Sequence, residues 1–150
     1  MEAFEQLRSD HVQARMLLVN LGRACQTALD RAQGLFATIR RELEIHAQLE
    51  QKLLYPALKS VAPVRVEQAL EDHRTIDHLL AQMQEHPLQE PEFSSWVWDL
   101  AENVEHHIEL QENELFSIAQ VRLSAPVLEE LEQEMRNLRV ALTRAALAGS

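Results

Sequence analysis

His46 and Glu50 are the two residues whose types and spacing first suggest chemistry. In an α-helix, side chains four residues apart lie on the same face, one above the other. Apolar residues continue this stripe at helical spacing in both directions: Phe36, Ile39, Leu43, Leu53 and Leu54. Such a stripe should face a core, where a carboxylate is almost never buried without a partner. A metal ion bound beside the imidazole of His46 would compensate the charge of Glu50.

A second copy of this pattern lies later in the chain. His11 precedes His46 by 35 residues, His73 precedes His107 by 34 residues, and an aspartate stands immediately before the first histidine of each pair. The segments eight and nine residues after the second histidine of each pair also match: they are Leu54-Tyr55 and Leu115-Phe116. The sequence therefore predicts a two-fold repeat of a helix pair, in which each helix carries one inward-facing histidine.

The apolar spacing predicts five helices in a single domain over residues 1–150. They are expected from about residue 2 to the mid-twenties, then at about 28–58, 64–85, 92–121 and 125–148. Their inward faces carry His11 on the first helix, His46 and Glu50 on the second, His73 and Asp77 on the third, and His107 on the fourth. The fifth has an apolar stripe without histidine, so it should pack on the bundle or form a homodimer contact. The predicted fold class is all-α: an up-down-up-down four-helix bundle at about residues 2–121, with an additional C-terminal helix.

Composition limits the partners of this domain. A net charge of -10 with neutral histidines argues against nucleic acid and against an anionic membrane surface. No run approaches the roughly 18 apolar residues of a membrane span. The single cysteine, Cys25, permits no internal disulfide. The N-terminal residues lack the basic-then-apolar pattern of a signal peptide, so we expect a cytoplasmic protein.

The histidines and carboxylates should converge, because antiparallel neighbours in a bundle bring mid-helix positions to a common level. The candidate metal ligands are His11, His46, Glu50, His73, Asp77, His107 and Glu112. This set is too large for one tetrahedral zinc, and it suits two octahedral ions that share bridging carboxylates, one from each repeat. Mixed imidazole and carboxylate ligands suit iron, zinc or manganese. A polar core without metal is the alternative, although it would bury several ionisable groups at a cost of several kcal/mol.

Several familiar catalytic patterns are absent from the sequence. A ferritin-like di-iron site needs Glu-x-x-His pairs, and no glutamate lies three residues before a histidine. The His-Glu-x-x-His pattern of zinc peptidases is missing too. No nucleophile–base pair stands out, so an enzyme acting on a carbon substrate has no support.

The ordered motifs resemble those of the hemerythrin-like, or HHE cation-binding, family over about residues 5–120. These motifs are Asp10-His11, His46-x-x-x-Glu50, Asp72-His73 and His107-x-x-x-x-Glu112. The resemblance implies a four-helix bundle that holds two iron ions with an oxo or hydroxo bridge. It also implies the ligands: His73 and His107 for one iron, His11 and His46 for the other, and Glu50 and Glu112 as bridges.

Two departures from the family pattern bear on function. Oxygen-carrying hemerythrins have His-x-x-x-His on the third helix, whereas Asp77 stands at the second of these positions here. An anionic ligand there would favour ferric iron and make a poorer reversible oxygen carrier. Glu112 lies five residues after His107, about 140° around an ideal helix, and the neutral Gln111 takes the four-residue spacing.

The resulting functional hypothesis is a non-haem di-iron protein that binds or senses O2, peroxide, nitric oxide or iron itself. Iron is preferred to zinc or manganese, and an enzymatic role is the less favoured reading. The alternative is a helical interaction module, metal-responsive or without metal, that uses the C-terminal helix as its contact surface.

Overall fold

The computed structural model describes residues 4–88 and 90–149, which are almost entirely helical and contain no strand. The helical elements in chain order are α1 (Glu5–Thr27), α2 (Leu29–Leu49), η1 (Glu50–Leu54), α3 (Tyr55–Leu58), α4 (Pro63–Gln84), α5 (Pro91–Leu110), η2 (Gln111–Leu115), α6 (Phe116–Arg122) and α7 (Ala125–Ala148). The expected start of the first helix, at residue 2, lies outside the described residues. The other expected bounds agree with the structure to within one or two residues.

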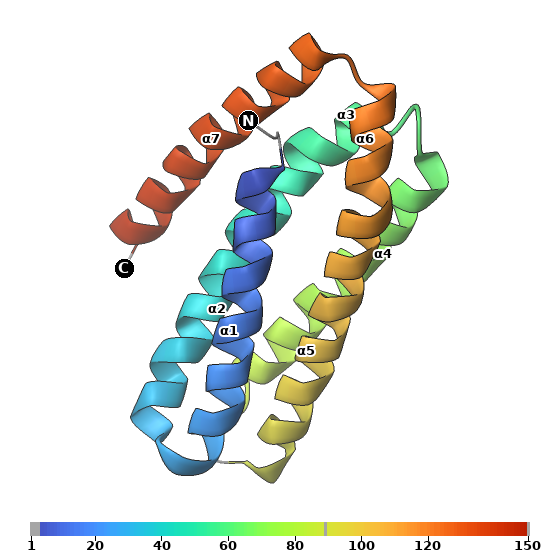
Figure 1. Ribbon diagram of the computed structural model, residues 1–150. Helices are drawn as coiled ribbons and strands as arrows, with labels where there is room; N and C mark the ends of the chain where they lie inside the picture. Colours follow the sequence, from blue (N-terminus) through green and yellow to red (C-terminus); the bar gives the residue numbers. More distant parts are fainter. Residues whose placement is uncertain (1–3, 89, 150) are drawn as a thin grey trace.

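Four long rods form the bundle and alternate in direction along the chain (Figure 1). The first is α1, the second runs from α2 to α3, the third is α4, and the fourth runs from α5 to α6. Both connections at the lower end of Figure 1, from α1 to α2 and from α4 to α5, join antiparallel neighbours. The predicted all-α bundle with up-down-up-down topology and an extra C-terminal helix is therefore confirmed.

A five-residue π-helical segment interrupts the second and the fourth rods at equivalent places. η1 begins four residues after His46, and η2 begins four residues after His107. The chain remains helical through both segments, so Pro56 in the first turn of α3 does not end the second rod. Single-turn π-helical segments inside α-helices occur frequently at functional sites. Here they show that the internal repeat extends to the backbone.

The apolar core consists of two clusters, one toward each end of the bundle. The cluster nearer the two interhelical connections at the lower end includes Leu21, Ile39, Met83 and Leu100. The other includes Phe4, Leu54, Leu58 and Phe116. Along each rod a buried histidine lies between residues of the two clusters: His11, His46, His73 and His107. The bundle therefore has a polar layer between two apolar ones.

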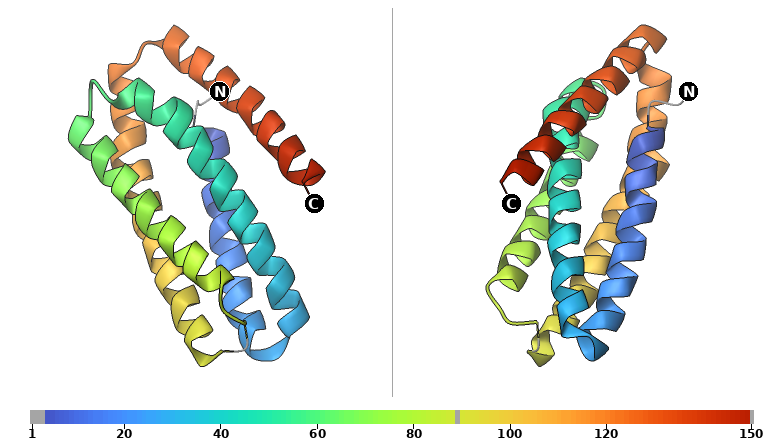
Figure 2. Two further views of the ribbon diagram at one scale, coloured as in Figure 1. Left: turned by 180° about the vertical axis from the view of Figure 1, so that it is seen from behind. Right: turned by 90° about the vertical axis from the view of Figure 1, so that its left-hand side faces the viewer.

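α7 packs on the outside of the bundle against α2 and η1 (Figures 1 and 2). The Ser124 hydroxyl caps its start by accepting a hydrogen bond from the Val127 backbone N–H at 3.4 Å. Leu131 and Met135 are each only 5% exposed, and they join the core cluster around Phe4 and Leu54. Of the two roles expected for this helix, packing on the bundle is thus observed. None of the described helices combines the length and apolar character that crossing a membrane requires.

Candidate metal centre

The Nε2 atoms of the four buried histidines point into the polar layer. Glu50 is fully buried at its centre. Its Oε1 atom lies 2.9 Å from His73 Nε2 and 3.2 Å from His107 Nε2, and its Oε2 atom lies 3.0 Å from His46 Nε2. His11 Nε2 lies 3.1 Å from the side-chain oxygen of Gln111. One carboxylate from the second rod thus contacts imidazoles from three rods.

Side chains outside this layer hold the opposite ring nitrogens of three histidines. His46 Nδ1 donates to Asp10 at 2.8 Å, and His11 Nδ1 donates to Glu112 at 2.6 Å. Gln51 Nε2 donates to His73 Nδ1 at 2.7 Å. Metal-binding histidines almost always donate their second ring N–H to such an acceptor, as His46 and His11 do here, which fixes the ring and directs the other nitrogen at the metal.

The protonation of the layer reflects the burial of Glu50 among imidazoles. Burial alone would raise the pKa of the Glu50 carboxyl, but His46 and His107 hold this pKa well below its usual value. Burial would lower the pKa of His46, yet the Glu50 and Asp10 carboxylates raise it to about 10. The pKa of His11 is lowered by burial and by the proximity of His46. Without a cation of another kind, a proton on His46 balances the buried carboxylate.

Two groups of ligand atoms in the layer are spaced closely enough to hold metal ions. One consists of His11, His46 and Glu50, and the other of Glu50, His73 and His107, with the ligand atoms of each group within 4.8 Å of one another. Glu50 belongs to both groups, so its two oxygens could serve two neighbouring cations. His46 Nε2 is buried without a well-aligned hydrogen-bond partner. A native structure rarely leaves such an atom unsatisfied, and a bound cation would satisfy it.

The structure brings together five of the seven predicted ligands, and the other two lie outside both groups. Glu112 is 28% exposed at its side chain and contacts the outer nitrogen of His11. Asp77 is exposed, because the helix places Ile76 on the inner face beside His73. The inner-face position that the sequence suggested for Asp77 is therefore corrected, and so is the central position suggested for Glu112.

Gln111 and Tyr55 are buried in the layer, although neither was among the predicted ligands. Gln111 is fully buried, and its amide donates to Glu50 Oε2 and, at 3.0 Å, to the Tyr55 hydroxyl. That hydroxyl also lies 3.0 Å from His73 Nε2. Burial and the Glu50 charge raise the pKa of Tyr55 well above its usual value. The repeat could have identified Gln111, since it follows His107 by the same four residues that separate Glu50 from His46.

A small cavity of about 50 Å³ adjoins three of the four buried histidines. His11, His46 and His107 form one part of its wall. The rest consists of the apolar side chains of Ala14, Leu43, Ile76, Val104 and Ile108 and the polar ones of Asp10, Gln13 and Glu42. The layer therefore has a space beside its imidazoles that is large enough for one or two water-sized molecules.

Comparisons with known proteins agree with this arrangement. The fold matches the crystal structure of a hemerythrin HHE cation-binding domain-containing protein, the Rv2633c homolog from Mycobacterium kansasii, with a TM-score of 0.81 and 26% sequence identity. The match covers 99% of this chain and 91% of that one.

A second relative is a protein of Nostoc sp. (strain PCC 7120 / SAG 25.82 / UTEX 2576) named DNA nickase. It is 28% identical over 131 residues, which are 87% of this chain, and the chain spans about 37% of that protein's length. The hemerythrin HHE cation binding domain matches residues 2–119, nearly the whole chain. With its buried layer of histidines around one glutamate, the chain therefore belongs to the hemerythrin HHE cation-binding domain family.

Proposed function

We propose that this protein is a non-haem di-iron protein that binds or senses O2, peroxide or nitric oxide inside the bundle. The observation that carries the proposal is the sharing of Glu50 by two histidine groups. His73 and His107 would hold one iron, His11 and His46 the other, and Glu50 would bridge them. Bound iron would supply reversible one-electron chemistry and coordination positions for a small ligand.

The donor set is compatible with iron. Four imidazoles and a carboxylate are ligands of intermediate hardness, which suit iron, manganese or zinc and disfavour a soft metal. More than four donors, arranged in two groups, exceed what a structural tetrahedral zinc needs. The Tyr55 hydroxyl lies next to Glu50, and the amide oxygen of Gln111 lies 3.1 Å from His11 Nε2, so both oxygens are further candidate donors.

The adjoining cavity supports a very small ligand. At about 50 Å³ it is far below the roughly 300–1,000 Å³ typical of pockets for organic ligands. The apolar part of its wall, with Leu43, Ile76 and Val104, would favour a small diatomic molecule such as O2 or nitric oxide over water. The site is thus better suited to sensing, storing or removing a small oxidant than to transforming a carbon substrate.

DNA nicking, the activity in the name of the Nostoc relative, is not part of the proposal. This chain spans only about 37% of that protein. A net charge of -10 also opposes binding to phosphates, which basic surfaces normally mediate. A cytoplasmic location is proposed on the single cysteine, Cys25.

A second candidate function is an iron-responsive interaction module that uses α7. It is favoured by the direct contact of Arg139 on α7 with Asp10, which holds the imidazole of His46. A homodimer through α7 that forms only with iron would support this function, and sedimentation with and without iron would detect it. A sedimentation coefficient independent of iron would remove it.

Absorption spectroscopy of the iron-loaded protein tests the main proposal. Ferric iron in the bundle should give near-ultraviolet charge-transfer bands that shift when azide is added, and the ferrous protein should change its spectrum with nitric oxide. The metal-free protein is the control. Bound iron whose spectrum responds to none of these ligands would contradict the proposal.

A further inference from the structure

We propose that Arg139, on the outer helix α7, is a positioning residue of the metal centre. Through Asp10 it fixes the imidazole of His46 in the orientation that directs Nε2 at the metal. This inference rests on the proposed metal function of the site. It adds that α7 helps to orient a metal ligand and does not only pack on the outside of the bundle.

Three residues from three helices form a continuous chain of polar contacts. Arg139 Nη2 donates to Asp10 Oδ2 at 2.5 Å, and the same oxygen accepts from His46 Nδ1 at 2.8 Å. The side chains are mostly buried, with exposed fractions of 18% for Arg139, 22% for Asp10 and 9% for His46. His46 Nε2, on the far side of the ring, lies against Glu50.

In the other half of the repeat, no arginine of the described residues is paired with the corresponding aspartate, and the equivalent aspartate–histidine contact is not made. Asp72 and His107 correspond to Asp10 and His46. Among the described residues, however, Asp72 Oδ2 and His107 Nδ1 are both buried without a hydrogen-bond partner. The side chain near Asp72 is the ring of His106, which is 60% exposed and 3.9 Å away. The hydrogen bond between aspartate and histidine is thus formed in the half of the repeat where an arginine contacts the aspartate, and not in the other half.

Charge explains why the arginine matters. Burying a carboxylate costs free energy unless a cation compensates its charge, and a neutral imidazole does not provide that compensation. Once a metal occupies Nε2, His46 is neutral and no longer supplies that positive charge. The guanidinium of Arg139 does so permanently, because arginine does not lose its proton in proteins. Asp10 can then remain against His46 in both the metal-free and the metal-bound protein.

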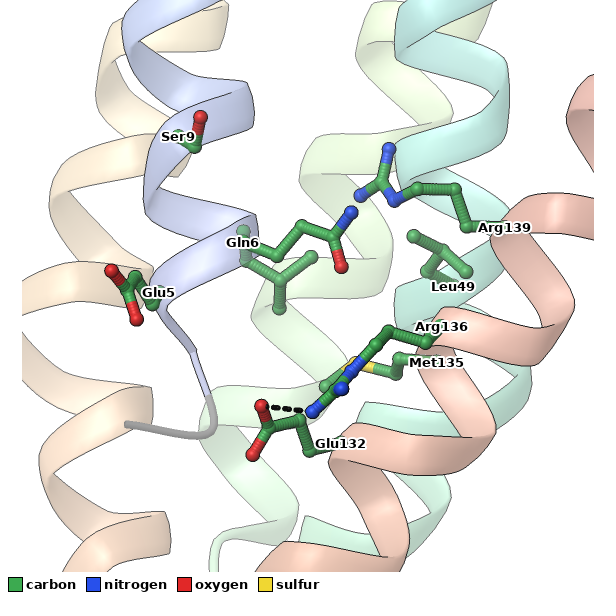
Figure 3. A pocket seen from close by; sticks show the side chains of 9 residues that line it. Glu5, Gln6, Ser9, Leu49, Glu132, Met135, Arg136 and Arg139 are labelled. Carbon is green, nitrogen blue, oxygen red and sulfur yellow. Dashed lines mark hydrogen bonds and ion pairs between the residues drawn. The ribbon is translucent and has the colours of Figure 1, made fainter. Parts of the chain in front are cut away.

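Arg136, one turn earlier on α7, offers a matched control. Both arginines line a cavity of about 340 Å³ between α7 and the bundle. Figure 3 shows Arg136 turned toward Glu132 of its own helix, while Arg139 points away from this pair. Arg136 Nη2 donates to Glu132 Oε1 at 2.5 Å. Replacing Arg136 therefore removes the same charge from the same helix without affecting Asp10.

The test compares iron affinity, measured by competition with a chelator, for the wild type, Arg139→Gln and Arg136→Gln. Arg139→Gln should lose about 10-fold or more in affinity at one of its iron ions, the usual effect of removing an outer hydrogen-bond partner. Arg136→Gln should match the wild type. Asp10→Asn should weaken binding similarly, and adding Arg139→Gln to it should cause no further loss, because Arg139 acts only through Asp10.

Leu131→Ala separates positioning from simple loosening of α7, because Leu131 anchors that helix in the apolar core cluster and has no polar group that could bond Asp10. The Leu131→Ala variant should have a lower midpoint temperature of thermal unfolding, but its iron affinity should stay within about two-fold of the wild type. Equal losses in Leu131→Ala and Arg139→Gln, or equal affinities in Arg139→Gln and Arg136→Gln, would overturn the positioning role. A wild type that binds no iron would instead contradict the proposed function itself.

Discussion

The amide of Gln111 donates a hydrogen bond to the carboxylate of Glu50 across the centre of the bundle. The two residues occupy equivalent places in the repeat, each four residues after a buried histidine and each the first residue of a π-helical segment. The layer therefore contains a carboxylate from one half of the chain and a neutral amide from the other. This asymmetry leaves one buried negative charge among four histidines.

Substituting Gln111→Glu tests that asymmetry. In the metal-free protein the new carboxylate would face Glu50, and an uncompensated buried charge typically costs about 3–5 kcal/mol of unfolding free energy. Iron should reverse the effect, because a second bridging carboxylate strengthens binding. Denaturant titration measures the unfolding free energy of the variant without iron and with iron. Gln133→Glu on the exposed side of α7 is the control. Equal stability of the two metal-free variants would contradict the buried contact.

Asp77 and Glu112 should behave differently from each other when each is neutralised. Asp77→Asn should leave iron content and affinity unchanged, because the side chain is exposed. Glu112→Gln should retain iron but lose about 10- to 100-fold in affinity, since it weakens the partner that orients His11. Metal analysis of purified variants and chelator competition provide the measurements. Loss of one iron per chain in Asp77→Asn would instead make this aspartate a ligand.

Filling the small cavity should separate ligand binding from metal binding. Val104 is 3% exposed and lines the cavity beside the histidines. Val104→Phe should preserve iron content, reduce azide binding several-fold, and cost about 1–3 kcal/mol of unfolding free energy through overpacking. Val19→Phe on the exposed face of α1 is the control. Unchanged azide affinity in Val104→Phe would show that ligands reach the iron by a route other than this cavity.

The metal-free protein should have a stability maximum in mildly acidic solution. The pKa of His46 rises from 6.5 to about 10, so its contribution is complete below pH 6.5 and disappears as the pH rises through about 10. The pKa of Glu50 falls well below 4.5, so its contribution is complete above pH 4.5 and is lost on acidification. The midpoint temperature of thermal unfolding should therefore be highest between about pH 4.5 and pH 6.5. His46→Gln should flatten the alkaline side, and an unchanged alkaline slope would contradict the His46–Glu50 pairing.

The sequence predicted the fold and the central part of the site because both follow from helical periodicity. His11, His46, His73 and His107 stand in apolar stripes, so their burial needed no knowledge of neighbouring helices. The family resemblance also assigned them to two groups that share Glu50, and the structure contains those groups.

Periodicity alone did not settle two positions. Ideal helical spacing favours Gln111, four residues after His107, over Glu112 for the inner face, and the structure agrees; it was the family pattern that placed Glu112 among the ligands. Asp77 and Ile76 are neighbours, and apolar packing selected Ile76 for the inside. The contact of Arg139 with Asp10 joins residues 129 positions apart, for which local spacing gives no signal.

Iron content per chain, measured by elemental analysis on protein purified with iron supplied, tests the central claim most directly. The shared position of Glu50 predicts close to two irons per wild-type chain and a sharp fall in Glu50→Ala, with Asp77→Ala as the matched loss of an exposed carboxylate. An iron content that is negligible in the wild type, or unaffected by removing Glu50, would contradict a di-iron centre built around this residue.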